Sequence, residues 1–536
     1  MTIRYDTVRG RPWFVVDGEE AAQVYRMASH IPGVRARRNT MRIPADPRLL
    51  ELIFRGQSPK MDAKVYGWYT RQRKQEEYLE ELIAQGDCSV VHPRAERLWP
   101  FQRVGVDFIR RAGNCLLADE CGLGKTATTI VSTETARRFD RILCVCPNAL
   151  KRWWANEVKT WSAYDPPTMV VDSPQRQRLI EEYERGWFII NYEQLRLAPE
   201  LASMSWDWII YDEAHRLKNR RTQTFQAAKE LRARRVLELT GTPVGNNPAE
   251  LWSLLHLLRP GRYASYWRFF EMYVKYKEDY FGREILGTLN SDLLRRELAT
   301  VMVRREKEQV LADLPDKVYQ TIPLELTTEQ TKFYRQMARD MLLELEDRVL
   351  TAPNVITMIL RLRQISSTLA NFDLPDDSCK LDAVMDILDA NPSKLVVFTQ
   401  FRKTVQALCN RLAKANIEFQ SIMGGLGTDE IARRVEYFQG TRECRVMVGT
   451  AATGGVGLTL TSSPTVVFVD KHWNPIQQAQ AEDRVHRIGQ KETVHIITLH
   501  CPRTADELVE AVLAKKLRMQ SEILQTALAE HLEQVS

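Results

Sequence analysis

A loop with two glycines and a lysine has the composition that binding of nucleotide phosphates requires. It runs from Asp119 to Lys125 (DECGLGK), contains Gly122 and Gly124, and is followed by Thr126. Glycines let backbone N–H groups approach phosphate oxygens, the lysine can reach the β- and γ-phosphates, and the threonine hydroxyl can bind Mg²⁺. The pattern predicts a phosphate-binding loop. Because Asp119 stands where the general pattern has glycine, a glycine-rich turn without a ligand is the alternative.

Two adjacent acids in the run DEAH are the second feature that could do chemistry. Asp212 and Glu213 directly follow the apolar residues 208–211, which read as a strand. Ligands bind at the carboxyl ends of parallel strands, and adjacent carboxylates there are costly unless a cation or a reaction uses them. We expect Asp212 to hold Mg²⁺ and Glu213 to orient and deprotonate the attacking water. His215 would sense the γ-phosphate or link to the next motif.

Two arginines near the C-terminus, Arg484 and Arg487, lie three residues apart in AEDRVHRIGQ. This spacing predicts that they share one face of a helix. Paired arginines commonly bind carboxylates of their own domain. The other interpretation is that they are arginine fingers, which neutralise transition-state charge on the γ-phosphate and accelerate hydrolysis by ~10³–10⁵. Such fingers would complete the site only when two lobes close.

Short apolar runs alternate with helical segments through most of the chain and would position these groups. Runs of this kind are typical of parallel strands buried on both faces. The fold class is therefore predicted to be α/β, with two parallel-sheet lobes. The expected strands are 115–118, 142–146, 187–190, 208–211 and 236–239 in the first lobe, and 394–398, 446–449 and 466–469 in the second.

The same pattern divides the chain into segments. The expected order is a small α+β accessory domain at 1–56, a helical linker at 57–94, the first lobe at 95–260, helical insertions at 261–378, the second lobe at 379–510, and a C-terminal helix at 511–536. Within the accessory domain, helices are expected at 19–29 and 49–54. Arginines 35, 37, 38 and 42 of this domain could follow a phosphate backbone, or they could form a solvated charged face.

Composition narrows the class of protein. The chain has 536 residues and a net charge of +6, which permits a nucleic-acid partner without requiring one. Nine cysteines without a C-x-x-C pair indicate reduced thiols and no zinc site. No apolar run has the ~20 residues of a membrane span. We expect a cytoplasmic, nucleoid-associated protein if the source is prokaryotic or viral, and a nuclear one if it is eukaryotic.

Taken in order, the motifs resemble those of superfamily-two helicase-like ATPases of the Swi/Snf type. They are FQRVGVDF, ADECGLGKT, YDEAH, LTGTP, VFTQF, GTAATGGVGLTLT and AEDRVHRIGQ, and they cover roughly residues 95–515. Asp119 fits that family although it breaks the general phosphate-loop rule. The resemblance implies RecA-like lobes, ATP and Mg²⁺ as cofactors, and ATP-driven translocation on double-stranded DNA.

The resemblance also assigns roles by position. Gln102 is expected to read adenine, Thr126 and Asp212 to bind the metal, and Arg484 and Arg487 to be fingers. The remaining positions near the nucleotide are Asp119, Gly122, Leu123, Gly124, Lys125, Glu213, His215, Gly455 and Gln480. The DNA contacts are expected at Asn148, Trp154, Thr399, Thr450 and Trp473.

The N-terminal segment is similar to the small repeat found ahead of annealing-helicase (HARP-like) members. We therefore predict a monomeric ATP-dependent DNA translocase that remodels or reanneals branched DNA, with protein partners unspecified. The alternatives are a translocase that displaces DNA-bound proteins, in remodelling or defence, a strand-separating helicase, and a nucleotide-gated DNA clamp with little turnover. The intact acid pair and both arginines argue against the clamp.

Overall fold

The computed structural model describes most of the chain between residues 2 and 507. The residues it leaves out in this range are 9–10, 18–20, 22–24, 26–33, 38–39, 45–59, 136–140, 173–177, 179–181, 244–246, 280–281, 312, 348–351, 451–457 and 473. The helices expected at 19–29, 49–54 and 511–536 lie outside the described residues, wholly or for the most part. The described chain forms two compact units, one of residues 2–120 and 124–305, the other of residues 121–123 and 306–507.

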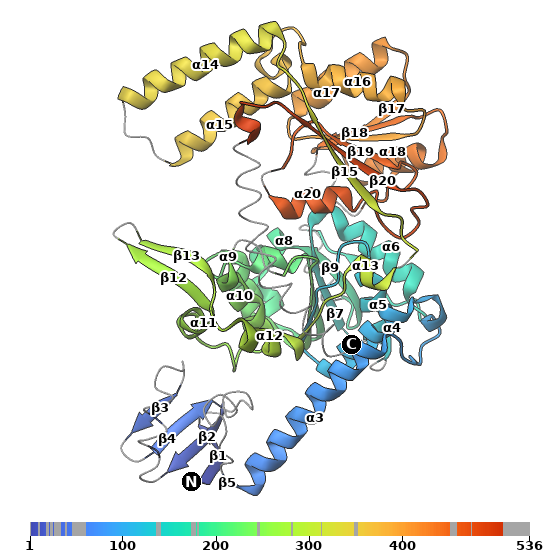
Figure 1. Cartoon of the computed structure of the whole chain (residues 1–536). Coiled ribbons are helices and arrows are strands. Elements are labelled where there is room, and N and C mark those ends of the chain that lie inside the picture. The colour runs from blue at the N-terminus through green and yellow to red at the C-terminus, as the bar shows by residue number, and fades with distance from the viewer. Residues whose placement is uncertain are drawn as a thin grey trace. The chain divides into compact units, whose positions relative to one another are not determined.

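The chain begins with a small, largely antiparallel sheet in the order β3-β4-β2-β1-β5 (Figure 1). Buried apolar side chains from β1, β2 and β4 give it a small core of its own that includes Ile3, Phe14, Val16, Met41 and Ile43. The strands are β1 (Thr2–Val8), β2 (Arg11–Asp17), β3 (Arg35–Arg37), β4 (Thr40–Pro44) and β5 (Lys60–Met61).

A long helix, α3 (Ala63–Gln85), follows the small sheet, as the sequence predicted for this segment. Its N-cap is Asp62, whose side chain accepts from the backbone N–H of Val65 at 2.7 Å and from that of Tyr5 at 3.3 Å. Asp62 therefore ties the start of the helix to the sheet. The helix ends at Gly86, which has a left-handed φ of 69°.

The first large sheet is entirely parallel within the described residues, in the order β14-β6-β11-β10-β7-β9-β8. Its central strands are buried on both faces, which explains their continuous apolar sequences. The strands are β6 (Cys115–Leu117), β7 (Arg141–Cys146), β8 (Thr168–Val170), β9 (Gly186–Asn191), β10 (Ser205–Asp212), β11 (Arg232–Leu239) and β14 (Met302–Val303).

Helices cover both faces of this sheet (Figure 1). One group consists of α4 (Pro100–Ala112), α5 (Lys125–Thr135) and α6 (Lys151–Trp161), and the other of α8 (Tyr192–Leu197), α9 (Gln223–Glu230) and α10 (Leu251–Leu258). Short 3₁₀ turns complete the connections: η1 (Ala95–Arg97), η2 (Asn148–Leu150), η4 (Pro199–Ser203), η5 (Ala214–Leu217) and η6 (Pro248–Glu250).

The segment that the sequence predicted as helical insertions also contains strands. After α11 (Tyr266–Tyr273) comes an antiparallel hairpin of β12 (Val274–Asp279) and β13 (Gly282–Thr288), then α12 (Ser291–Ala299). The next strand, β14, joins the first large sheet beside β6, and β15 (Lys317–Pro323) joins the second. The strands β14 and β15 were missed because their pairing partners, β6 and β20, lie far away in the sequence.

The second large sheet is also parallel throughout its described strands, in the order β15-β20-β19-β16-β18-β17. Besides β15, its strands are β16 (Leu395–Thr399), β17 (Phe419–Ile422), β18 (Val446–Thr450), β19 (Thr465–Phe468) and β20 (Val494–His500). The helices of this unit are α13 (Lys307–Val310), α14 (Thr328–Asp347), α15 (Ala352–Ser367), α16 (Cys379–Ala390), α17 (Arg402–Lys414), α18 (Thr428–Gly440) and α20 (Pro475–Glu482), with η7 (Leu369–Phe372) between α15 and α16.

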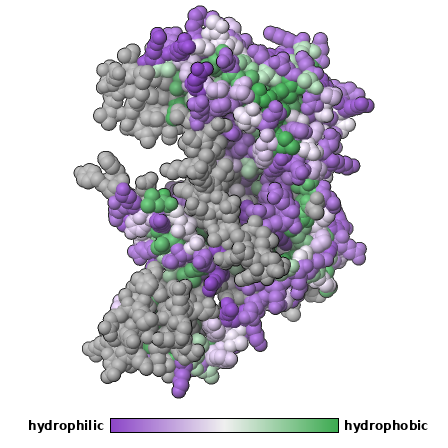
Figure 2. Space-filling view, in the orientation of Figure 1, coloured by the Kyte–Doolittle hydropathy of each residue, from purple (hydrophilic) through white to green (hydrophobic). Residues whose placement is uncertain are grey.

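Two parallel α/β lobes, with a small N-terminal sheet, confirm the predicted fold class. Each lobe has its own apolar core on the two faces of its sheet. In the part of the chain that is described, no helix has the length and hydropathy of a membrane span. The coloured part of the face drawn in Figure 2 is mostly hydrophilic and carries small apolar groups, as expected for a surface that meets water.

Candidate active site

The predicted phosphate loop connects β6 to α5 at the carboxyl edge of the first large sheet. Gly122 and Gly124 have left-handed φ values of 88° and 74°, which side chains rarely adopt. A Cβ on Gly124 would also collide with the side-chain amide of Gln102 on α4. The loop can therefore take this path only with glycine, and the path places Gln102, predicted to read adenine, directly against the loop.

Lys125 is the first residue of α5, and its ammonium lies within the loop. Its Nζ donates to the backbone oxygens of Asp119 at 2.7 Å and Glu120 at 3.2 Å. The N-terminus of α5 begins at the same place and carries a partial positive charge. A cation, a helix terminus and a glycine-rich backbone thus converge as a phosphate site requires. Leu123, also in the loop, is fully buried.

The Asp119 carboxylate is held by Arg305, a residue to which the sequence assigned no role. Arg305 Nε and Nη2 donate to the two carboxylate oxygens at 2.8 and 2.5 Å, and both side chains are buried. Arg305 also donates to the backbone oxygen of Phe101 on α4. Asp119 thus anchors the loop through an ion pair, which explains an acid where the general motif has glycine. The proximity follows from β14 pairing with β6.

Asp212 ends β10, so it shares the carboxyl edge with the phosphate loop. The residue is 9% exposed, and its Oδ1 accepts from the backbone N–H of Glu213 at 3.0 Å. Burial, followed by the charge of Glu213, raises the pKa of Asp212 to about 6, while a hydrogen bond from Trp154 and the charge of Lys125 act in the opposite direction. Because β10 and β6 both pair in parallel with β11, Asp212 and the phosphate loop lie at the same edge of the sheet.

Glu213 has an unusual backbone conformation, with φ 53° and ψ 49°. A non-glycine residue in the left-handed region is strained by roughly 1–3 kcal/mol and is frequent at functional sites. Its Oε2 lies 3.2 Å from His215 Nδ1, and His215 Nδ1 lies 3.5 Å from the Thr240 hydroxyl at the end of β11. The strained turn therefore points the second acid and the histidine towards the ends of neighbouring strands.

The oxygen donors at this edge fit Mg²⁺. The Asp212 carboxylate and the Thr126 hydroxyl are hard ligands. Each Asp212 oxygen accepts one hydrogen bond from the protein and has lone pairs left for a cation. Among the described residues, no group of three His, Cys, Asp or Glu side chains could hold a metal alone. Mg²⁺ that accompanies a nucleotide needs only one or two protein ligands because phosphates and water supply the rest.

Arg484 and Arg487 do not lie on a helix, contrary to the sequence prediction. Helix α20 ends at Glu482, and both arginines lie in the turns that follow it, so they do not share a helix face. Arg487 donates to the backbone oxygen of Leu458 at 3.2 Å. The i, i+3 spacing predicted helix geometry because it carries no information on where a helix ends.

Buried charges of the second lobe hold this segment in place. Lys307 on α13 donates to Asp483 Oδ1 at 2.6 Å and to the backbone oxygen of His486 at 2.7 Å, and all three residues are buried. Lys317 lies 3.3 Å from Asp483 and 3.6 Å from Glu482. These lysines keep the pKa of Asp483 below its usual value despite its burial. Gln480, predicted near the nucleotide, is also buried on α20.

Two of the predicted DNA contacts lack the surface that such a contact requires. Trp154 is 0% exposed, and its indole Nε1 donates to Asp212 Oδ2 at 2.8 Å. Thr399, at the end of β16, is 1% exposed, and its hydroxyl donates to Asp470 Oδ2 at 2.5 Å. Both predictions are corrected: each side chain points into its own lobe, where a carboxylate at the end of a strand accepts its hydrogen.

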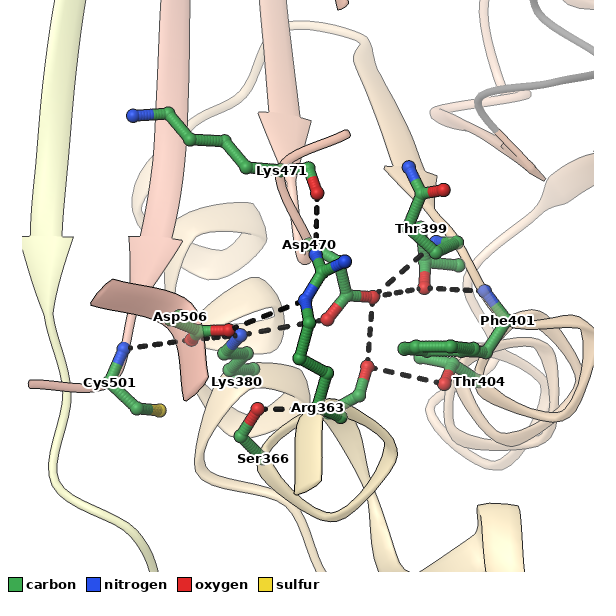
Figure 3. Close-up of polar contacts among 12 residues, drawn as sticks. Arg363, Ser366, Lys380, Thr399, Phe401, Thr404, Asp470, Lys471, Cys501 and Asp506 are labelled. Atoms are coloured by element: carbon green, nitrogen blue, oxygen red, sulfur yellow. Dashed lines mark hydrogen bonds and ion pairs between the residues drawn. The ribbon is translucent and has the colours of Figure 1, made fainter. Parts of the chain in front are cut away.

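Figure 3 shows the network to which Thr399 belongs in the second lobe. Asp470 also accepts from the Ser367 hydroxyl at 2.9 Å, and its Oδ1 lies 3.6 Å from the fully buried amine of Lys380. Lys380 donates to Asp506 Oδ2 at 2.8 Å, and Arg363 donates to the backbone oxygen of Lys471 at 2.5 Å. The network joins the ends of β16, β19 and β20 to α15 and α16.

The other predicted DNA contacts remain predictions. Asn148 is exposed at the end of β7, where its Oδ1 accepts from the Asn191 side chain of the next strand at 2.9 Å. Thr450 ends β18 and is 7% exposed. Trp473, together with Gly455 of the predicted nucleotide site, lies outside the described residues.

Fold and site define a class: helicase-like ATPases built on two RecA-like lobes. The glycine-rich loop and the DEAH motif lie on the first lobe, and the arginine motif lies on the second. Family models agree, because the SNF2-related domain matches residues 62–370 and the helicase conserved C-terminal domain matches residues 379–489. The chain belongs to the SNF2-related family, and it carries the ATP-hydrolysing core of that family.

Several curated proteins are similar to this chain. The SWI/SNF-related matrix-associated actin-dependent regulator of chromatin subfamily A-like protein 1 of Xenopus tropicalis is 30% identical over 455 residues, or 82% of this chain and 46% of the relative. The human DNA annealing helicase and endonuclease ZRANB3 is 28% identical, over 79% of this chain and 40% of the relative. The putative ATP-dependent helicase/translocase YwqA of Bacillus subtilis is 29% identical, over 80% and 49%.

The chain thus spans less than half the length of these relatives. Among solved structures, the Sulfolobus solfataricus SWI2/SNF2 ATPase core in complex with dsDNA matches with a TM-score of 0.39 and 27% identity. The match covers 80% of this chain and 93% of that one.

Proposed function

We propose that the protein is an ATP-dependent translocase on double-stranded DNA that remodels or reanneals branched DNA. The observation that supports ATP turnover is the convergence of Lys125 and the buried Asp212 at one edge of one sheet. DNA as the substrate is supported by the names of relatives, among them an annealing helicase and a putative helicase/translocase.

In this proposal each polar group of the first lobe has a distinct task. The loop backbone and Lys125 bind the β- and γ-phosphates, and Thr126 and Asp212 are the protein ligands of Mg²⁺. When bound, Mg²⁺ neutralises phosphate charge and orients the γ-phosphoryl group. Glu213 accepts a proton from the attacking water, and its left-handed backbone sets the direction of the carboxylate.

Arg484 and Arg487 are the proposed arginine fingers. Arg487 donates from Nη1 to the backbone oxygen of Leu458 at 3.2 Å, which fixes one side of its guanidinium within the second lobe. The Lys307–Asp483 pair holds the segment next to them. A finger stabilises charge that develops only in the transition state, so its loss lowers the turnover number far more than nucleotide affinity.

Three single variants test the assignment of these tasks. We expect Lys125→Ala to weaken ATP binding, whereas Glu213→Gln and Arg487→Ala bind ATP normally and lose hydrolysis by roughly 10²–10⁴ and 10³–10⁵. Binding is measured with a fluorescent ATP analogue and hydrolysis by phosphate release. The control is Arg433→Ala, an exposed arginine of α18 paired with Glu430. Loss of ATP binding in Arg487→Ala would contradict the finger role.

The DNA substrate is tested by phosphate release with single-stranded, duplex and forked DNA. Stimulation by duplex DNA, together with displacement of a triplex-forming strand, supports translocation. A clamp gives almost no DNA-stimulated release, and a strand-separating helicase unwinds forks without displacing the triplex. The role of the N-terminal sheet is tested with Arg42, which is exposed on β4. If that sheet binds branched DNA, Arg42→Ala should reduce the stimulation of phosphate release by forked DNA but not by duplex DNA.

A further inference from the structure

The buried indole of Trp154 lies against the carboxylate that ends β10. Trp154 is on α6, is 0% exposed, and donates from Nε1 to Asp212 Oδ2 at 2.8 Å. A buried indole N–H requires an acceptor, and most such groups find a neutral carbonyl. Here the acceptor is a functional acid, and hydrogen bonds to an ionised group are shorter and roughly twice as strong.

The indole has little freedom to move away from this acid. Its ring stacks on Trp187 of β9, with centroids 6.0 Å apart and an interplanar angle of 28°. The ring of Trp153, the preceding residue on α6, packs edge-on against the Trp154 ring, with centroids 6.1 Å apart and an interplanar angle of 83°. Because the ring is held by α6 and β9, the direction of its N–H bond is set by the packing of the lobe.

Each oxygen of the carboxylate therefore has one protein donor. Oδ2 accepts from Trp154, and Oδ1 accepts from the backbone N–H of Glu213 at 3.0 Å. The hydroxyl of Tyr192, on α8, donates to the backbone oxygen of Asp212 at 2.7 Å. Two donors fix the plane of the carboxylate, and the indole cannot exchange a proton with it. The remaining lone pairs then point in defined directions.

We propose that Trp154 is a positioning residue, which orients the Asp212 carboxylate so that its free lone pairs meet the Mg²⁺ that accompanies ATP. This inference rests on the proposed function. It explains why Trp154 lies inside the lobe with its N–H on the acid. Ligating carboxylates are commonly oriented by hydrogen bonds, and loss of such a partner typically lowers metal affinity about 10- to 100-fold.

The test compares two phenylalanine variants from one aromatic stack. Trp154→Phe removes the N–H donor, whereas Trp187→Phe removes a similar volume from the neighbouring, equally buried ring, for which no contact with Asp212 exists among the described hydrogen bonds. The measurement is calorimetric binding of a non-hydrolysable ATP analogue with Mg²⁺ and with EDTA. This separates metal-dependent affinity from nucleotide affinity and does not use turnover.

We expect Trp154→Phe to bind the metal-free analogue like the unsubstituted chain and to need roughly tenfold more Mg²⁺ for tight binding. Trp187→Phe should resemble the unsubstituted chain in both measurements. Equal Mg²⁺ requirements in the two variants, or equal loss of metal-free binding, would overturn the inference. If the unsubstituted chain itself shows no Mg²⁺-dependent binding, the proposed function fails instead.

A spectroscopic measurement on the unsubstituted chain keeps the inference testable if Trp154→Phe does not fold. The chain contains 12 tryptophans, whose indole N–H groups are separately visible in ¹⁵N–¹H spectra. We expect one indole signal with slow hydrogen exchange to shift when Mg²⁺ is added to the nucleotide-bound chain. The same response to Mg²⁺ should occur in Trp187→Phe. Absence of any Mg²⁺-dependent shift among the slowly exchanging indoles would count against a link to Asp212.

Discussion

At the scale of single residues, the site depends on buried carboxylates with specific partners. Asp119 has Arg305, and Asp212 has Trp154 and the N–H of Glu213. A carboxylate can be buried in this way only if a cation or hydrogen-bond donors compensate its charge, because an unpaired charge in the interior is strongly unfavourable. Each acid thus accepts a hydrogen bond from the side chain of another element, Arg305 after β14 for Asp119 and Trp154 on α6 for Asp212.

Replacement of Asp119 should show how much its ion pair with Arg305 stabilises the first lobe. Asp119→Ala leaves the Arg305 guanidinium buried and without its carboxylate, and we expect the first lobe to lose about 3–5 kcal/mol of stability. Urea unfolding measures the loss. The control is Lys403→Ala, which breaks the exposed pair with Asp373 and should cost at most about 1 kcal/mol. Equal losses in the two variants would mean that the buried pair has no special role.

At the scale of elements, the turns after α20 are shaped by residues from α13 and β15. His486 illustrates this: its Nε2 lies 2.7 Å from the backbone oxygen of Pro315, and its other ring nitrogen is buried and has no hydrogen-bond partner among the described residues. Burial lowers the pKa of His486 below 6.5, and Lys307 and Lys317 lower it further, against the hydrogen bond to Pro315 and the charge of Asp483.

A pH dependence of stability follows from this shift. With a depressed pKa in the folded state, the unfolded chain binds the proton first, so stability is complete above 6.5 and falls as the pH drops towards the folded-state pKa. His486→Gln keeps an N–H donor for Pro315 and cannot titrate. We expect its unfolding midpoint to fall less than that of the unsubstituted chain between about pH 8 and about pH 5.5. A larger fall in the variant would contradict this assignment.

At the scale of the whole molecule, the two units have separate cores, so we expect thermal unfolding in more than one transition. Lys380→Met keeps most of the side-chain volume but leaves Asp470 and Asp506 buried without their shared cation. Calorimetry should show one transition lowered by several degrees and the other unchanged. The exposed Lys403→Met serves as the control, and a uniform shift of both transitions would argue against independent units.

Local patterns in the sequence were sufficient for much of this description. The alternating apolar runs and the helical pattern after the small sheet depend on neighbouring residues, so the α/β class and the course of α3 could be predicted from them. Long-range pairings could not be predicted in this way. The strands β14 and β15 are recognised only by their partners, β6 and β20, which lie far away along the chain.

By itself, the sequence determined which residues could bind phosphate and metal, because that chemistry requires particular side chains at particular spacings. Only the tertiary structure decided what several neighbouring residues do. It turned Trp154 and Thr399 inward to Asp212 and Asp470, placed Arg305 on Asp119, and ended α20 before Arg484. The physical reason is that a buried polar group must find a partner, and the partner comes from whichever element the fold packs beside it.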